Sequence, residues 1–370
     1  MSLWDKRRRS GPEESLDSED VLELLSSLVE KSLVVLDGAT GRYRLLETVR
    51  QYGIERLVDG DESDGIRGRH LDYFLALAEE AEPHLKGAEQ QAWLERLEAE
   101  HDNVRAALGF APFLSTDSGL RLAGALSRFW MVRGHFGEGR RWLGEMLDQA
   151  WAQAHTEARG KALTGASLLA HSQGNYASAR ALYEESLAIC RDLGDRRGIA
   201  MSLNNLGSVA QRQGDYRAAG ALFELALEID RGIGNRAWIA TNLNNMGNVA
   251  REQGDYSSAR GLHEESLAIK RELGDRAGIA NSLEGLAQLV SMLSGPYRAA
   301  RIWGAAERLR EEIGSPLPLR ERPDYDRHVA GARTALGDDA AFDRAWREGR
   351  AMTLEEAAEY ALKDRINFPD

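Results

Sequence analysis

The chain has 370 residues, of which 43% are apolar, and its 59 acidic and 47 basic side chains give a formal net charge of −12. This length allows two or three globular domains, or a small domain followed by a repeat array. The negative charge argues against non-specific binding to nucleic acid and to anionic membranes, because both depend on clustered Lys and Arg side chains.

Residues 1–17 are predicted to be a disordered lead-in. The basic run Lys6–Arg9 is followed by Ser, Gly, Pro and Glu, so it lacks the apolar segment of a signal peptide. No run in the chain approaches the ~18 apolar residues that a membrane span requires. Cys190 is the single cysteine, which excludes an intrachain disulfide and fits a reducing compartment. We therefore expect a cytoplasmic protein without a membrane partner.

A helix, a hairpin and a second helix are predicted over residues 18–60, as a partial winged-helix segment. The acidic start at Ser18–Asp20 indicates a helix N-terminus. Two strand patterns, 32–36 and 42–46, flank a glycine-bearing turn, and another helix begins at Glu47. This order is that of the back half of a winged helix, without the helices that come first. Because about 40 residues rarely fold alone, we expect this segment to pack against other protein.

Residues 61–118 are predicted to form a helical linker region. Apolar side chains at helical spacing between 63 and 110 indicate two or three helices. Their apolar faces contain Leu71, Phe74, Leu75, Leu77 and Ala78, and then Trp93, Leu94, Leu97, Val104 and Leu108.

One sequence pattern recurs every 40 residues through the stretch 119–314. Its marker is a Gly-Asp-Tyr or Gly-Asn-Tyr turn. Copies of this turn stand at Gly174–Tyr176, Gly214–Tyr216 and Gly254–Tyr256. A fixed period of this length is typical of a stacked array, in which one unit cannot bury its own apolar face. Each unit reads as two helices, so we predict an all-α solenoid of about five helix pairs, with a degenerate first pair at 119–150 and a fifth at about 276–313.

Residues 315–370 are predicted to be capping helices and a tail. The run Ser315–Pro318 ends the last repeat helix, because proline cannot continue it. Short helices over 322–362 are expected to cover the exposed end of the array.

The repeats resemble the tetratricopeptide repeat. The matching positions in the central unit are Leu203, Leu206, Gly207, Ala210, Gly214, Tyr216, Ala219, Phe223 and Ala226. The period of 40 is that of the kinesin-light-chain-like variant, whereas the common repeat has 34. Gly207 and Gly247 recur inside the first helices, where glycine costs about 1 kcal/mol relative to alanine, which indicates close helix–helix approach. The resemblance implies a solenoid whose first helices line a concave groove.

Other segments resemble the C-terminal part of bacterial LuxR-type and antibiotic-regulator-like signal-transduction ATPases. The segments that carry this resemblance are Leu24–Val34, Tyr43–Tyr52, His70–Glu79, Leu97–Leu108, Phe129–His135, Trp303–Glu307 and Trp346–Ala357. It implies a winged-helix segment and a sensor role for the repeats. It also implies a partner, namely a nucleotide-binding domain from an upstream or separate polypeptide, because that domain would precede residue 18.

A search for catalytic and metal-binding patterns finds none. The dipeptide Gly160-Lys161 lacks the remainder of a phosphate-binding loop. The run His263–Leu267 starts like a zinc-protease motif but has no second histidine. The eight histidines show no ligand spacing; we assign His263 to a solvated helix face and Cys190 to packing. We therefore predict no enzyme, no metal and no cofactor.

The predicted binding site is the groove lined by the first helices. Its candidate residues are Asn204, Asn205, Ser208 and Arg212 in one helix, and Asn244, Asn245, Asn248 and Arg251 in the next. Asparagine is a poor helix former, so this recurrence needs a reason. One reason is pairing with the backbone of an extended peptide. The alternative is that the amides bond neighbouring helices and fix the twist of the solenoid.

These observations favour a non-catalytic scaffold or sensor of a bacterial regulatory system, which binds a protein or peptide partner in the groove. Two alternatives stay open. One is a DNA-binding transcription regulator that uses the winged-helix segment, and the other is a groove that holds a small inducer. The helix at 20–31 carries Asp20, Glu23 and Glu30 against a single Lys31. This acidic character disfavours nucleic acid as a partner.

Overall fold

The computed structural model describes residues 18–38, 41–60, 63–87, 89–149, 154–293, 295–317 and 321–363. The predicted lead-in at 1–17 and the last residues of the predicted tail, 364–370, lie outside the described part. The chain divides into two compact units, 1–69 and 70–370, each of which has its own internal packing.

The first unit is a helix, a hairpin and a second helix. Its elements are α2 (Ser18–Glu30), β1 (Val34–Asp37), β2 (Arg42–Leu45) and α3 (Glu47–Asp59). The two strands are antiparallel, with Val34 opposite Leu45. The order of elements agrees with the expectation, while the identity of this unit as part of a winged helix stays a prediction. Its core is small: Val34 is buried, but other large apolar side chains, such as Val35 and Tyr52, are about half exposed.

Three α-helices and one short 3₁₀-helix precede the repeats. They are α4 (Ser63–Ala81), η1 (Glu82–Leu85), α5 (Gln90–Ala99) and α6 (His101–Leu114). Leu71 and Phe74 of α4 belong to the same buried cluster as Leu94, Leu97 and Leu108. That cluster continues into the first two helix pairs, so within the second unit this region shares the core of the repeats.

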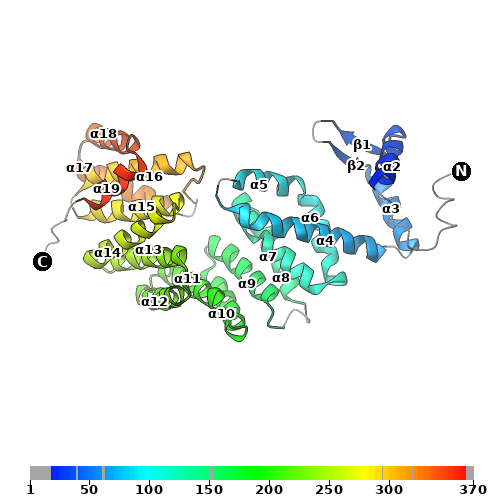
Figure 1. Cartoon of the computed structure of the whole chain (residues 1–370), viewed down its shortest axis with the longest axis horizontal. Coiled ribbons are helices and arrows are strands. Elements are labelled where there is room, and N and C mark those ends of the chain that lie inside the picture. Colours follow the sequence, from blue (N-terminus) through cyan, green and yellow to red (C-terminus); the bar gives the residue numbers. More distant parts are fainter. Residues whose placement is uncertain are drawn as a thin grey trace. The chain divides into compact units, whose positions relative to one another are not determined.

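Five helix pairs form the repeat array (Figure 1). They are α7 (Thr116–Arg133) with α8 (Phe136–Leu147), α9 (Glu157–Ser172) with α10 (Tyr176–Asp192), α11 (Arg196–Arg212) with α12 (Tyr216–Ile233), α13 (Arg236–Glu252) with α14 (Tyr256–Glu272), and α15 (Arg276–Met292) with α16 (Pro296–Glu312). In four of the five pairs the turn between the two helices contains a glycine in the left-handed region, with φ of +80° at Gly214. The carboxylate of Asp215 then accepts a hydrogen bond from the Ala218 N–H at 3.0 Å and caps the next helix. The predicted all-α solenoid is confirmed.

Four of the five pairs bury a ring at the same position of their second helix, and in two of them the ring packs against a glycine of the first helix. These rings belong to Tyr183, Phe223, His263 and Trp303, and all are at most 2% exposed. A Cβ atom on Gly207 would lie 2.6 Å from the Phe223 ring, and one on Gly247 would lie 2.9 Å from the His263 ring. The prediction of close helix–helix approach is therefore confirmed. The placement of His263 on a solvated face was wrong, because this histidine takes the buried ring position of its repeat.

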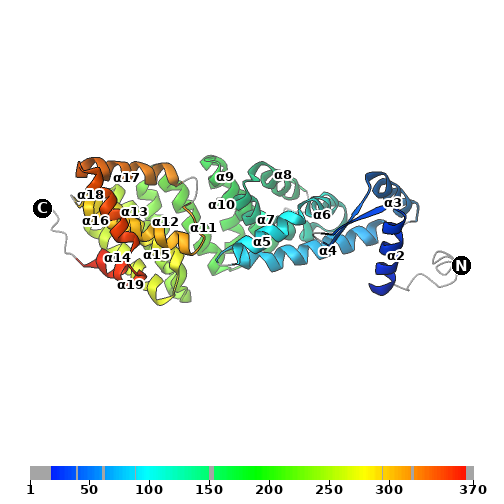
Figure 2. The same cartoon turned by 90° about the horizontal axis from the view of Figure 1, so that it is seen from above.

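Three further helices pack at the C-terminal end of the array (Figure 2). They are α17 (Arg322–Leu336), α18 (Asp339–Arg350) and α19 (Leu354–Leu362). Phe342 and Ala345 of α18 are fully buried in one cluster with Trp303 of the last pair. The Thr353 and Glu356 side chains form a reciprocal capping box that starts α19. α17 contacts α15 and α16, and this contact brings its first turn to the predicted groove.

Candidate binding face and histidine cluster

The first helices of neighbouring pairs lie side by side, since α13 contacts both α11 and α15. On α11, the residues Met201, Asn205, Ser208 and Arg212 are spaced by three or four positions, so they share one side of the helix. On α13 the same side carries Asn245 and Asn248, which stand 40 residues after Asn205 and Ser208. We call the surface formed by these residues the inner face.

Asn204 does not belong to the inner face. Its side chain is 4% exposed, and its Nδ2 donates to Oδ1 of Asn242 at 2.6 Å. The Nδ2 of Asn242 in turn donates to the buried carboxylate of Asp230 at 2.8 Å. This residue therefore follows the alternative, in which an amide bonds neighbouring helices, and its assignment to the groove is corrected. The cause is the 100° turn between successive helix residues, which directs position 204 into the stack and position 205 outward.

The next interface along the array contains a different polar pair. Lys270 stands 40 residues after Asp230, and its Nζ donates to the Oγ of Ser282 at 3.0 Å. Ser282 occupies the position equivalent to Asn242, and its Oγ also lies 3.3 Å from Oδ1 of Asn244. Burial lowers the pKa of Lys270 to about 8. Asn244 thus has a contact inside the stack, although it is partly exposed.

Three amides of the inner face remain available. The side chains of Asn205, Asn245 and Asn248 are partly exposed. Within the described residues, none of these three amides has a hydrogen-bond partner on the protein. The hydroxyl of Ser208 donates to the carbonyl of Asn204 at 3.1 Å, so it points back along its own helix. The inner face therefore offers unpaired donors and acceptors at positions that repeat between two adjacent pairs.

One end of the inner face is covered by α17. Nη1 of Arg212 lies 2.9 Å from a carboxylate oxygen of Asp324 in the first turn of α17. Arg251 is 7% exposed, and it donates to the Gln288 and Glu252 side chains. Burial lowers the pKa of Arg251. Both arginines were predicted to bind a partner, yet the structure engages Arg212 with α17 and encloses Arg251.

The other end of the inner face opens into a pocket. The N-terminal parts of α11 and α13 line this pocket, and Met201 and Trp238 are among its large apolar side chains. The lining residues are Asp195, Arg197, Gly198, Met201, Ile233, Gly234, Asn235, Arg236, Ala237, Trp238 and Leu273. This pocket was not predicted, because its lining does not coincide with the recurring polar positions. Trp238 stands where the neighbouring repeats have Gly198 and Gly278, so a departure from the repeat pattern was the available signal.

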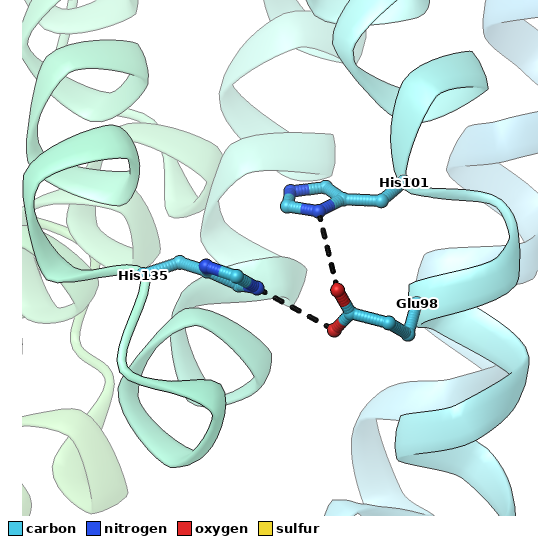
Figure 3. A group of neighbouring side chains, drawn as sticks. All are labelled: Glu98, His101 and His135. Atoms are coloured by element: carbon cyan, nitrogen blue, oxygen red, sulfur yellow. Dashed lines mark hydrogen bonds and ion pairs between the residues drawn. The ribbon is translucent and has the colours of Figure 1, made fainter.

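A group of side chains that could bind a metal ion lies at the N-terminal end of the repeat array. Glu98 at the end of α5, His101 at the start of α6 and His135 between α7 and α8 converge there (Figure 3). Each carboxylate oxygen of Glu98 faces one imidazole ring, at 3.8 Å from His101 Nδ1 and 3.4 Å from His135 Nε2. This cluster was not predicted, because the histidines show no ligand spacing in the sequence. His101 lies in α6, before the repeat array, and His135 lies in the turn of the first helix pair, so no local spacing relates them.

Charged neighbours surround this group. His101 Nε2 lies 3.2 Å from a carboxylate oxygen of Glu138 on α8. Arg105 donates twice to Glu138, at 2.7 Å each, and these hydrogen bonds hold the pKa of Glu138 down at about 2. Burial lowers the pKa of His101. At neutral pH the site therefore combines an ionised Glu138 with a neutral His101.

Within the described residues, every helix is too short or too polar to cross a lipid bilayer.

The repeats match a known sequence family. Residues 159–232 and 238–305 match the tetratricopeptide repeat. Among curated sequences, proteins of Mycobacterium bovis and Mycobacterium tuberculosis that are named putative HTH-type transcriptional regulators are 36% identical over 206 residues. The match covers 52% of this chain and 23% of each relative, so the chain spans about a quarter of the length of these relatives.

Two solved structures share the fold at low sequence identity. NprR in complex with its cognate peptide NprX has a TM-score of 0.54 and 14% identity, over 95% of this chain and 90% of that one. A Rap protein complexed with competence and sporulation factor has a TM-score of 0.51 and 13% identity, over 80% of this chain and 89% of that one. Together with the 40-residue helix pairs and their buried rings, these matches lead to one conclusion: the array has the fold of a tetratricopeptide-repeat solenoid, and residues 159–232 and 238–305 match that repeat in sequence.

Proposed function

We propose that this chain is a non-catalytic sensor or interaction module of a bacterial regulatory system, and that it binds an extended peptide segment on the inner face. The observation that carries the proposal is the set of three partly exposed, unpaired amides, Asn205, Asn245 and Asn248. An amide side chain offers both a donor and an acceptor, which matches the peptide backbone. The similar structure of NprR, which was solved with its cognate peptide NprX, supports the same use of the fold.

The pocket beside the amides supplies the apolar part of the proposed contact. Met201 and Trp238 give a partly exposed apolar surface, which suits an apolar side chain of the peptide. Arg197 lines the same pocket and favours a carboxylate nearby, whereas Arg236 of this pocket is paired with Glu272. A small inducer would use this pocket alone, whereas a peptide would also use Asn205 and Asn245.

The first unit supports a second contact, with a partner domain. Its large apolar side chains are mostly exposed, in a number that is high for so small a unit: Val21, Leu22, Leu33, Val35, Leu36, Tyr43, Leu45, Leu46, Tyr52 and Val58. Such a concentration marks a protein-binding surface. The resemblance to signal-transduction ATPases makes a nucleotide-binding domain the proposed occupant. Asp20, Glu23 and Glu30 on α2 disfavour DNA at this surface.

The test of the peptide proposal starts from a selection of random peptides of about ten residues, which extend to about 33 Å, against the full chain. Binding of the selected peptides is then measured by fluorescence anisotropy with Asn205→Ala/Asn245→Ala. Each lost amide contact contributes about 1 kcal/mol, so the double variant should bind some tenfold or more weakly at an unchanged melting temperature.

Asn204→Ala is the matched control, because it truncates the adjacent amide inside the stack. It leaves buried partners unpaired at a cost of about 1–3 kcal/mol, so it should lower the melting temperature and keep the peptide affinity. Equal peptide binding by the wild type and the double variant would remove the inner face from the proposal. A large fall in the melting temperature of the double variant would assign these amides to the stack instead.

A further inference from the structure

We propose that Glu98, His101 and His135 bind a divalent transition-metal ion, with Zn²⁺ as the best match to the donor set. The three side chains each direct one ligand atom to a common point, and these atoms all lie within 4.8 Å of one another (Figure 3). Two imidazole nitrogens and one carboxylate oxygen are a ligand set that zinc uses, with a solvent molecule in the fourth position.

The distances need only small side-chain movements to reach metal coordination. With Zn–N and Zn–O bonds near 2.0–2.2 Å, ligand atoms around a tetrahedral ion are about 3.3 Å apart. His135 Nε2 lies 3.4 Å from one oxygen of Glu98 and His101 Nδ1 lies 3.8 Å from the other, and one ligand atom from each of the three residues lies within 4.8 Å of the other two. The two rings are tilted by 40° with their centroids 4.7 Å apart, so the nitrogens can converge without a change of backbone.

Glu138 supplies the outer support that a metal-bound histidine usually has. It lies 3.2 Å from His101 Nε2, on the side of the ring opposite Nδ1, and a modest ring rotation would make this contact a hydrogen bond. A proton on Nε2 leaves the lone pair of Nδ1 directed at the carboxylate of Glu98. Two acceptors then face each other, and a cation between them removes the repulsion. Carboxylate support of this kind fixes the tautomer of a ligand and raises its basicity.

One positive charge opposes the ion. Arg133 Nε lies 3.5 Å from the same Glu98 oxygen that faces His135. A bound metal ion must therefore compete with this guanidinium for Glu98. This competition predicts that removal of the Arg133 charge strengthens metal binding.

The three ligands come from separate elements of the second unit. Glu98 and His101 flank the corner between α5 and α6, and His135 is the N-cap residue of α8. A metal ion would tie the helices before the array to the turn of the first repeat pair. Metal binding should accordingly raise the melting temperature of the full chain.

The test is calorimetric titration of the full chain with Zn²⁺ after removal of metal by a chelator. We expect one ion per chain with a Kd of about 1 µM or tighter, and an intense visible Co²⁺ spectrum of the tetrahedral type when Co²⁺ replaces Zn²⁺. Glu98→Gln and His135→Gln should each weaken Zn²⁺ binding at least tenfold, and Glu138→Gln should weaken it by about 10–100-fold.

Two further variants separate a site from damage to the fold. Arg133→Gln should bind Zn²⁺ several-fold more tightly, an effect that unfolding cannot produce. His155→Gln removes another carboxylate-paired histidine, beside Asp192, and should leave the affinity unchanged. The proposal is overturned if the wild type binds no Zn²⁺ at this level, or if His135→Gln, folded by circular dichroism, binds as the wild type does, which would indicate adventitious surface binding only.

Discussion

His263 fills the ring position of its repeat with a group that can take up a proton. Its side chain is 0% exposed between Gly247 and Gly285, and neither ring nitrogen has a hydrogen-bond partner. Burial, together with the positive charges of Arg251 and Lys270, lowers its pKa to about 3 from the ordinary value of 6.5. The neutral ring is tolerated in the core, whereas a protonated ring is not.

Stability should therefore fall as the pH is lowered from about 6.5 toward 3. In this window the unfolded chain binds a proton at His263 and the folded chain does not, so the free energy of unfolding decreases by up to about 1.4 kcal/mol per pH unit. His263→Phe, which copies Phe223 of the preceding repeat, should remove this part of the slope and raise the melting temperature at pH 5. Thermal melts at pH 7.5 and pH 5 measure the effect, with His155→Gln as the control; an unchanged slope in His263→Phe would contradict the assignment.

At the scale of elements, α17 stands out because it belongs to no repeat yet reaches the inner face. Two neighbouring residues hold its first turn by different means. Asp324 forms the partly exposed ion pair with Arg212. Tyr325 packs on the buried cluster of the last pair, with its ring edge toward Trp303 at a centroid distance of 6.3 Å.

Tyr325→Ala should loosen α17 far more than Asp324→Ala. Loss of the packed ring should cost about 2–4 kcal/mol, whereas an ion pair of this exposure contributes about 0–1 kcal/mol. Urea unfolding gives the free energies, and the rate of trypsin cleavage at the arginines of α17 reports its local release. If Asp324→Ala releases α17 as readily as Tyr325→Ala does, the ion pair is the main attachment.

The elements differ in how far the sequence alone could predict them. The helix pairs, their turns and the close contact at Gly207 follow from positions that recur every 40 residues, and recurrence is visible without a structure. The histidine cluster does not recur, because His101 and His135 meet only through the packing of α6 on α7. Likewise, the separate roles of Asn204 and Asn205 depend on the rotation of α11 within the stack. Composition and periodicity do not determine that rotation to within one residue.

At the scale of the whole molecule, the repeat array is held together by contacts between neighbouring pairs. Such an array is stabilised one interface at a time. The central repeats share their turns and apolar positions, so their apolar surfaces alone would let α11–α12 pack on α15–α16 and omit the pair between them. The buried polar residues differ between the two interfaces, with Asp230 bonded to Asn242 at one and Lys270 bonded to Ser282 at the other.

These polar pairs should favour packing of each helix pair on its correct neighbour during folding. If one pair were skipped, Asp230 would meet Ser282, whose hydroxyl can donate but is shorter than the Asn242 amide. Where the hydroxyl does not reach, the buried carboxylate loses its donor at a cost of about 1–3 kcal/mol. Lys270→Asp with Ser282→Asn makes the two interfaces alike, as does Asp230→Lys with Asn242→Ser. Either double variant should refold from urea with a lower yield of native monomer than the wild type, and equal yields at matched stability would reject this role. A lower yield would mean that buried charged residues, which add little to stability, determine which of several near-identical repeats pack against each other during folding.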